Sequence, residues 1–172
     1  MFRFATRRLI VRPWRDDDRP ALARMTGDAT MMRYVSGATW TDCEIDEFLA
    51  RQQRHLTGHG VCFGAVERAT TGEVVGVSGM QPLDSGDFEL GWWTWKEHWG
   101  RGYAAEATRP FVDRARAMGL AHAWAVIDPD NRASMRVAAK LGMHYARTIA
   151  ASETISTRGD RLAALYRIEF DR

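Results

Sequence analysis

The sequence has little cysteine and no long apolar run, and each shortage excludes a class of protein. Only two of the 172 residues are cysteines, Cys43 and Cys62, and they form no C-x-x-C pair. A disulfide-rich scaffold is therefore excluded, and two free thiols in a reducing compartment are expected. No apolar stretch approaches the roughly 18 residues that span a bilayer, and residues 1–8 lack the apolar core of a signal peptide. We therefore expect a cytoplasmic protein that does not enter a membrane.

The chain also has little net charge and few potential metal ligands. Its formal net charge is +2, without any block of five or six consecutive basic residues, so neither nucleic acid nor a membrane surface is an expected partner. His55 and His59 are four residues apart, as two metal ligands on a helix would be. Gly58 and Gly60 flank His59, however, and predict that the helix ends there. No third ligand is evident, so we expect no metal site.

What the sequence does contain is enough apolar material for one core. Apolar residues make up 45% of the chain and charged residues 27%, values that are typical of a globular domain. The chain has no repeat, low-complexity tract or Pro/Gly linker. Residues 1–172 are therefore expected to form a single domain.

Periodicity and turn residues predict alternating strands and helices. In the first half, Thr41 and Glu44 have the spacing of a capping box, and the helix that they begin should continue to about Gly58. In the second half, Pro110 lies inside a predicted helix and should kink it. The predicted strands are 9–11, 61–67, 73–80, 88–95, 124–127, 145–153 and 162–170, and the predicted helices are 16–25, 41–58, 102–118 and 131–141. This order predicts a mixed α/β fold with an antiparallel meander and one β-α-β step.

The segment that begins the predicted helix 102–118 carries the strongest chemical signal. It reads Trp99-Gly100-Arg101-Gly102-Tyr103-Ala104-Ala105-Glu106. Glycines allow the backbone to approach a ligand closely, and the free N–H groups at a helix start attract anions such as a pyrophosphate. The alternative is a glycine turn that only reverses the chain. The pattern is neither a Walker A motif nor a dinucleotide-binding G-x-G-x-x-G.

A second candidate segment starts the predicted helix 131–141. Asn131 suits the N-cap, which places Ser134 in the first turn, where its hydroxyl could donate to a ligand. The alternative is a plain capping motif.

Four tryptophans, Trp92, Trp93, Trp95 and Trp99, lie within eight residues, with Trp93 and Trp95 on one face of the strand and Trp92 on the other. They could form an aromatic wall beside a substrate, or pack in the core.

Taken together, these segments resemble the GNAT superfamily of N-acetyltransferases, and within it the branch of Rim-type enzymes that acetylate the N-termini of ribosomal proteins. Four stretches carry the resemblance, in the order that the family has them. They are residues 6–13 (TRRLIVRP), 89–93 (ELGWW), 99–107 (WGRGYAAEA) and 131–143 (NRASMRVAAKLGM).

The resemblance implies a largely antiparallel central sheet of about seven strands that is flanked by helices. Strands four and five, here residues 88–95 and 124–127, would splay apart and hold the pantetheine arm of acetyl-CoA between them. It implies two catalytic residues: Glu89 as a base acting through water, and Ser134 as a hydrogen-bond donor to the departing sulfur. The alternative for Glu89 is a surface or salt-bridged carboxylate on the strand, without a catalytic role. The residues expected to bind the cofactor are Trp93, Thr94, Trp95, Gly100, Arg101, Gly102, Tyr103, Ala104, Asn131, Ser134 and Lys140.

The same resemblance implies direct attack of an amine on the thioester, without an acyl-enzyme, so neither cysteine is needed as a nucleophile. The favoured acceptor is the α-amine of a peptide N-terminus. Three alternatives stay open: a small amine such as an antibiotic, polyamine or amino acid; a non-catalytic acyl-CoA sensor; and a structural domain without CoA. By family analogy the protein is a monomer or a homodimer.

Overall fold

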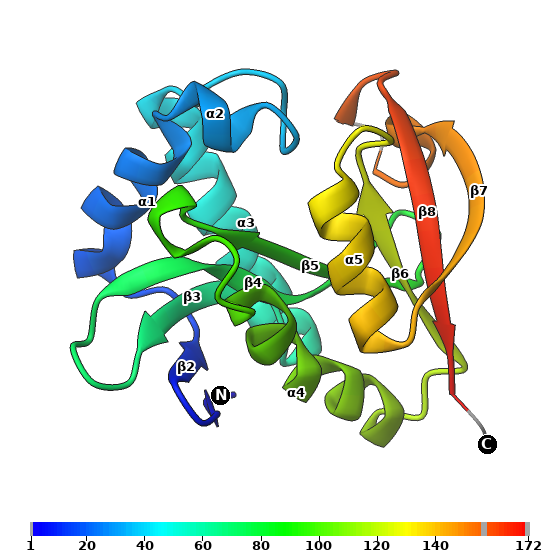
Figure 1. Cartoon of the computed structure of the whole chain (residues 1–172), viewed down its shortest axis with the longest axis horizontal. Helices are drawn as coiled ribbons and strands as arrows, with labels where there is room; N and C mark the ends of the chain where they lie inside the picture. Colours follow the sequence, from blue (N-terminus) through cyan, green and yellow to red (C-terminus); the bar gives the residue numbers. More distant parts are fainter. Residues whose placement is uncertain (1, 156–157, 171–172) are drawn as a thin grey trace.

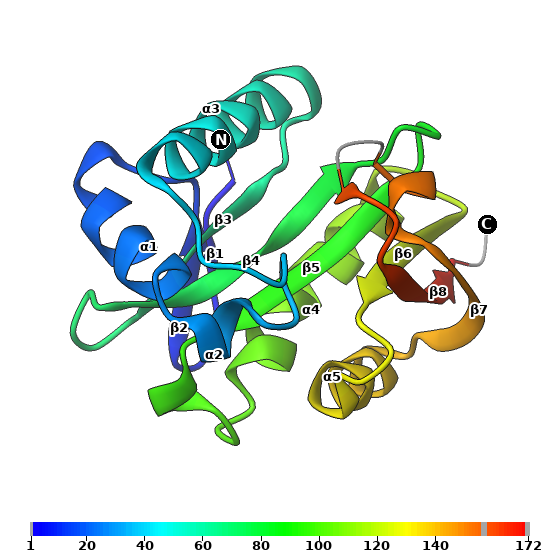
Figure 2. The same ribbon diagram turned by 90° about the horizontal axis from the view of Figure 1, so that it is seen from above.

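A computed structural model describes residues 2–155 and 158–170, which form one mixed, mostly antiparallel sheet with helices on both faces (Figures 1 and 2). The strands are β1 (Phe4–Ala5), β2 (Leu9–Arg12), β3 (Phe63–Arg68), β4 (Val74–Pro82), β5 (Phe88–Thr94), β6 (His122–Ile127), β7 (His144–Ala150) and β8 (Leu162–Glu169). The α-helices are α1 (Arg19–Thr26), α2 (Ala29–Met32), α3 (Asp42–His59), α4 (Tyr103–Ala117) and α5 (Arg132–Leu141). Short 3-10 turns occupy Asp16–Asp18, Lys96–His98 and Ala151–Glu153.

The eight strands lie in the order β1-β2-β3-β4-β5-β6-β8-β7. All neighbouring pairs are antiparallel except β5 and β6, which are parallel. A parallel pair needs a long crossover, and α4 supplies it. The predicted fold class, including the antiparallel meander and the β-α-β step, is confirmed.

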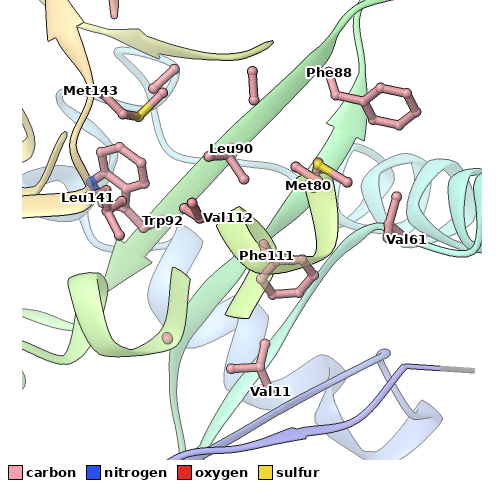
Figure 3. Packing of buried hydrophobic residues seen from close by; sticks show 14 of the residues in the cluster. Val11, Val61, Met80, Phe88, Leu90, Trp92, Phe111, Val112, Leu141 and Met143 are labelled. Atoms are coloured by element: carbon pink, nitrogen blue, oxygen red, sulfur yellow. The ribbon is translucent and has the colours of Figure 1, made fainter. Parts of the chain in front are cut away.

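Two apolar clusters hold the helices against opposite faces of the sheet. On one face, Phe111 and Val112 of α4 pack among Leu90, Trp92 and other strand residues, together with Leu141 of α5 (Figure 3). On the other face, residues of α1, α2 and α3 pack against Phe63, Val77, Trp93 and Trp95 of the sheet and the loop after it. The predicted division of Trp92 from Trp93 and Trp95 between the two faces is therefore confirmed.

Local signals account for most helix ends. Thr41 and Glu44 form the predicted capping box of α3, which continues through Gly58 and His59 and ends at Gly60, where φ is 70°. Asn131 caps α5 by accepting from the backbone N–H of Ser134, and Gly142 ends this helix at a φ of 87°. Left-handed backbone is available to glycine at little cost, which explains both ends.

Four elements differ from the sequence-based prediction. The helix predicted from residue 16 begins at Arg19, after a 3-10 turn at Asp16–Asp18. The strand predicted at residues 145–153 ends at Ala150, because Ala151–Glu153 turn as a 3-10 helix in which the Glu153 carboxylate accepts from the Ala150 N–H at 3.0 Å. The two-residue strand β1 and the four-residue helix α2 were not predicted, since segments so short show no periodicity. The helix α4 runs unbroken from Tyr103 to Ala117 with Pro110 inside it, and the kink at Pro110 stays a prediction. None of the helices formed by the described residues has the length and apolar character that crossing a bilayer requires.

Candidate active site

The site begins where two adjacent strands part. β5 pairs with β4 along its whole length, at seven positions from Phe88 to Thr94. With β6 on its other side, the structure describes one pair alone, Glu89 with Trp124. Beyond that pair, the edges of β5 and β6 that face each other carry backbone N–H and C=O groups without a strand partner. The splay that the sequence predicted for these two strands is confirmed, and it leaves hydrogen-bonding groups for an extended ligand.

The parallel direction of β5 and β6 brings two helix starts to this opening. α4 follows β5 and α5 follows β6, so the N-termini of both helices lie at the edge of the sheet where the two strands end (Figure 1). Each N-terminus has free N–H groups and the positive end of a helix dipole. This arrangement places the two predicted cofactor segments next to the same opening.

The start of α4 is shaped by two glycines. Gly100 and Gly102 have φ values of 74° and 78°, in the left-handed region that other residues rarely occupy. Gly102 is the N-cap of α4 and has no capping side chain, while the first bond within the helix joins Glu106 N–H to Gly102 O at 3.1 Å. The N–H groups of the residues between them, Tyr103 to Ala105, therefore have no partner within the helix. Arg101 is exposed beside them, and the whole turn can bind an anion.

Arg8 holds this turn in place. Its guanidinium group pairs with the Glu106 carboxylate at 2.6 Å, donates to Arg101 O at 2.9 Å, and lies 4.7 Å from the centre of the Tyr103 ring. Thr6 adds a hydrogen bond of 2.7 Å from its hydroxyl to Glu106. Burial opposes the charged form of Glu106, but the hydrogen bonds from Thr6 and Arg8 outweigh it, so the pKa of Glu106 lies below its ordinary value. The turn between β1 and β2 is thus joined to α4 at the point where α4 would meet a ligand.

The first turn of α5 leaves one hydroxyl group unused. Asn131 Oδ1 accepts from Ser134 N–H at 3.0 Å, which confirms the cap. The Ser134 side chain is half-buried, and none of the described residues forms a hydrogen bond with its hydroxyl group. At the other end of α5, the exposed Lys140 lines a surface depression together with Glu106 and Arg109 of α4. The structure therefore places Lys140 beside the α4 segment, farther along α5 than Ser134.

Trp93 of β5 and Trp95 just after this strand pack in the core, whereas Trp99 is exposed. Trp93 packs against Phe48 and Trp40, with ring centres 5.6 and 5.9 Å away. Trp95 is buried, and the Arg24 guanidinium lies 3.5 Å from the centre of its ring. Trp99 is 53% exposed, and its indole N–H donates to Thr94 O at 2.6 Å. The Trp95 N–H donates to Val75 O and Thr94 O accepts from Trp99, so part of the backbone expected to contact the ligand is already paired within the fold.

Glu89 lies at the last pair before the strands part, and its side chain is buried. Its Oε2 atom accepts a hydrogen bond of 3.0 Å from Gln81 Nε2 and forms an ion pair with the Arg158 guanidinium. Gln81 in turn accepts from Gln52 of α3 at 3.3 Å. A line of polar side chains thus runs from α3 through β4 to the apex of the opening.

Sequence reasoning identified Glu89 but missed Arg158 and Gln81. No short-range signal pairs Arg158 with a residue 69 positions away. Alternation gave no signal for Gln81 either, because every residue of β4 from Val75 to Gln81 is buried, whichever face of the sheet it is on. Among the residues that the structure describes, no group of three histidines, cysteines or carboxylates could hold a metal ion.

Comparison with known proteins agrees with this geometry. The sequence profile of the family described as "Acetyltransferase (GNAT) domain" matches residues 8–144, more than half of the chain. An uncharacterized Bacillus subtilis protein, YkkB, is 36% identical over 154 residues, which cover 86% of this chain and 88% of the relative.

Solved structures show the same fold over nearly the whole chain. An acetyltransferase from Agrobacterium tumefaciens is 25% identical, has a TM-score of 0.83, and is matched over 99% of this chain and 95% of its own. The ribosomal L7/L12 α-N-protein acetyltransferase RimL, solved with coenzyme A, has a TM-score of 0.79 at 14% identity, with 99% of each chain covered. At that identity the likeness to RimL concerns the fold alone.

The contacts of Glu106 lead to a stability prediction. Glu106→Gln should lower the free energy of unfolding by about 2 kcal/mol at pH 7, because a charge-assisted pair with Arg8 is lost. Since the folded-state pKa of Glu106 is depressed, its contribution is complete above the ordinary pKa of a glutamate and disappears as the pH falls through the folded value. Urea denaturation of wild type and variant at pH 7 and near pH 3 measures both differences.

The matched control is Asp113→Asn on the same helix, which removes a carboxylate from the exposed pair with Arg116 and should change stability little. Equal unfolding free energies for wild type and Glu106→Gln at pH 7 would show that the Arg8 contact does not stabilise the fold.

Proposed function

The chain belongs to the GNAT family of acetyltransferases and is thus an N-acetyltransferase, and we propose that it transfers the acetyl group of acetyl-CoA to the α-amine of a peptide N-terminus. One observation carries the proposal: β5 and β6 part directly beside the starts of α4 and α5. An acyl-CoA has an extended amide-containing arm and a pyrophosphate, and this opening offers unpaired strand edges for the first and free helix N–H groups for the second.

The residues around the opening suit the chemical groups of acetyl-CoA, the proposed acyl donor. We assign the pyrophosphate to the backbone of the α4 turn, from Gly100 to Ala104, where no carboxylate opposes an anion because Glu106 is already paired with Arg8. We assign the pantetheine arm to the backbone of Trp93, Thr94 and Trp95 and to Asn131 and Ser134. Lys140 supplies an exposed positive charge for a further phosphate. When bound, acetyl-CoA supplies a thioester carbonyl that an amine can attack.

The acceptor amine must be neutral to attack. An α-amine has a pKa of about 8 and a lysine side chain one of about 10.4. At pH 7 about a tenth of α-amines are therefore neutral, but well under a thousandth of lysines. A peptide N-terminus therefore needs less help from a catalytic base than a lysine does, which supports the α-amine as acceptor. The printed name of the structural neighbour RimL, an α-N-protein acetyltransferase, supports it too.

We assign the two remaining roles to Glu89, which accepts a proton, and to Ser134, which donates a hydrogen bond to sulfur. As the nitrogen–carbon bond forms and the carbon–sulfur bond breaks, the amine gives up a proton, which Glu89 accepts through water. Gln81 and Arg158 hold the Glu89 carboxylate through Oε2, so Oε1 is the oxygen to which the described residues donate no hydrogen bond. Ser134 donates a hydrogen bond to the departing sulfur, and its hydroxyl is available because Asn131 binds only the Ser134 backbone.

The direct test follows free thiol released from acetyl-CoA when purified protein meets a panel of N-terminal peptides, small amines and free amino acids. Thiol release with peptides would support the proposed acceptor, and release with small amines alone would replace it by the small-molecule alternative. A clear CoA-induced rise in melting temperature without thiol release on any acceptor would favour a sensor of acyl-CoA.

Replacing Glu89 tests the base. Glu89→Gln should lower kcat/KM by about 100-fold between pH 6 and 9, the size of a typical general-base contribution. Glu97→Gln, on the exposed 3-10 turn after β5, is the matched control and should keep wild-type kinetics. Melting temperatures show whether both variants fold. Full activity of Glu89→Gln across this pH range would remove Glu89 from the mechanism.

Replacing Ser134 tests the donor to sulfur. Ser134→Ala should lower kcat by about tenfold or more while the affinity for CoA changes little, because the hydrogen bond strengthens only as negative charge develops on sulfur. Steady-state kinetics and calorimetric titration with CoA separate the two quantities. Thr70→Ala, in the exposed β3–β4 turn, is the control for loss of a hydroxyl group. An unchanged kcat in Ser134→Ala would contradict this role.

A further inference from the structure

A group of basic side chains borders Glu89 on the side away from the α4 turn. Arg51, Arg54 and His55 lie on α3, and Arg158 lies in the connection between β7 and β8. Arg158 reaches Glu89 from that connection, and α3 reaches the same place through the Gln52–Gln81–Glu89 line of hydrogen bonds. The group is therefore beside the residue to which the proton-accepting role is assigned, and none of its members is among the residues assigned to the cofactor.

Arg51 is the member whose contacts are incomplete. Its Nε atom is buried, and no residue that the structure describes accepts a hydrogen bond from it. The guanidinium lies 5.6 Å from the centre of the Phe48 ring, a contact that supplies no hydrogen-bond acceptor. A buried guanidinium N–H without an acceptor is costly, so a position that retains one is a candidate for binding an acceptor from outside.

The electrostatic surroundings of Arg51 are positive. Burial removes its hydration, and the charges of Arg158 and Arg54 add repulsion that Glu47 and Glu89 only partly offset, so the pKa of Arg51 is held below its ordinary value. Arginine nevertheless stays protonated at neutral pH. Burial and the charge of Arg51 also lower the pKa of His55 to about 4, so His55 is neutral at pH 7, with a buried Nδ1 atom that has no partner among the described residues. A negative group placed here would be attracted.

We propose that the acceptor carries a carboxylate a few bonds from its reactive amine, and that Arg51 and Arg158 bind this carboxylate next to Glu89. The inference rests on the proposed function for the existence of an amine acceptor and adds the class of acceptor. Planar guanidinium groups bind a carboxylate through two parallel hydrogen bonds, which orients the ligand as well as holding it. A carboxylate shared by Arg51 and Arg158 also loosens the Arg158–Glu89 pair, and Glu89 then becomes a better partner for the neighbouring amine.

Two kinds of acceptor carry a carboxylate near an amine: a peptide with aspartate or glutamate close to its N-terminus, and a free amino acid.

Calorimetric titration of the full chain, saturated with CoA, compares the binding of three short peptides. They differ only at the second residue, which is Glu, Gln or Lys, and each has an amidated C-terminus. Free glutamate and its fully amidated form make the second arm. Binding rather than turnover is measured, so the result does not depend on which amine is acetylated.

We expect the Glu peptide to bind at least about tenfold more tightly than the Gln peptide, and the Lys peptide to bind more weakly than both. Arg51→Gln should abolish the difference between Glu and Gln while leaving the affinity for the Gln peptide nearly unchanged. Arg54→Gln removes the same charge from an exposed position on the same helix and should keep most of the preference. A preference confined to free glutamate would identify the free amino acid as the source.

Equal affinities for acid and amide in both arms would overturn the proposal, and so would a preference that survives Arg51→Gln. Thiol release from acetyl-CoA in the presence of any amine tests the proposed function separately. The proposal of an acidic acceptor can therefore be disproved while the acetyltransferase activity is confirmed. Melting temperatures of the two arginine variants establish that each is folded before its affinities are compared.

Discussion

The parting of β5 and β6 after the pair Glu89–Trp124 is the constraint on which the rest of the site depends. A continuous ladder between these strands would use up the backbone groups that the opening leaves unpaired. Because the two strands are parallel, the helices that follow them also start on the same side, which brings the α4 turn and the first turn of α5 to the opening. The position of Glu89 at the last pair places its carboxylate where the strands separate.

The near-zero net charge of the chain conceals two local positive regions that flank this opening. At the α4 turn, the positive end of a helix is kept available because Arg8 pairs with Glu106. On the other side of Glu89, Arg51 and Arg158 concentrate guanidinium groups against one buried carboxylate. The first region suits the phosphates of an acyl donor, and the second suits an acidic acceptor. Binding of both would place an amine between them, beside Glu89 and close to the strand edges.

Much of the fold could be predicted because its signals are short in range. The capping box of Thr41 and Glu44, the Asn131 cap and the glycine at the end of α5 depend on residues within four positions of one another. The same holds for Gly100 and Gly102, whose spacing predicted the glycine turn at the start of α4. The prediction was wrong where one element ends without a strong signal, as at Ala150, and incomplete for β1 and α2, which are too short to show a period.

The sequence by itself therefore determined the order of the longer elements, which depends on local pattern, and the resemblance of its motifs indicated the family and the candidate residues Glu89 and Ser134. Only the tertiary structure decided which distant side chains complete the site: Arg8 with Glu106, and Arg158 and Gln81 with Glu89. The physical reason is that an ion pair between residues separated by 69 or 98 positions needs the intervening chain to fold first. No residue type or spacing in the sequence predicts such a pair, because its energy comes from the burial and proximity that the folded sheet creates.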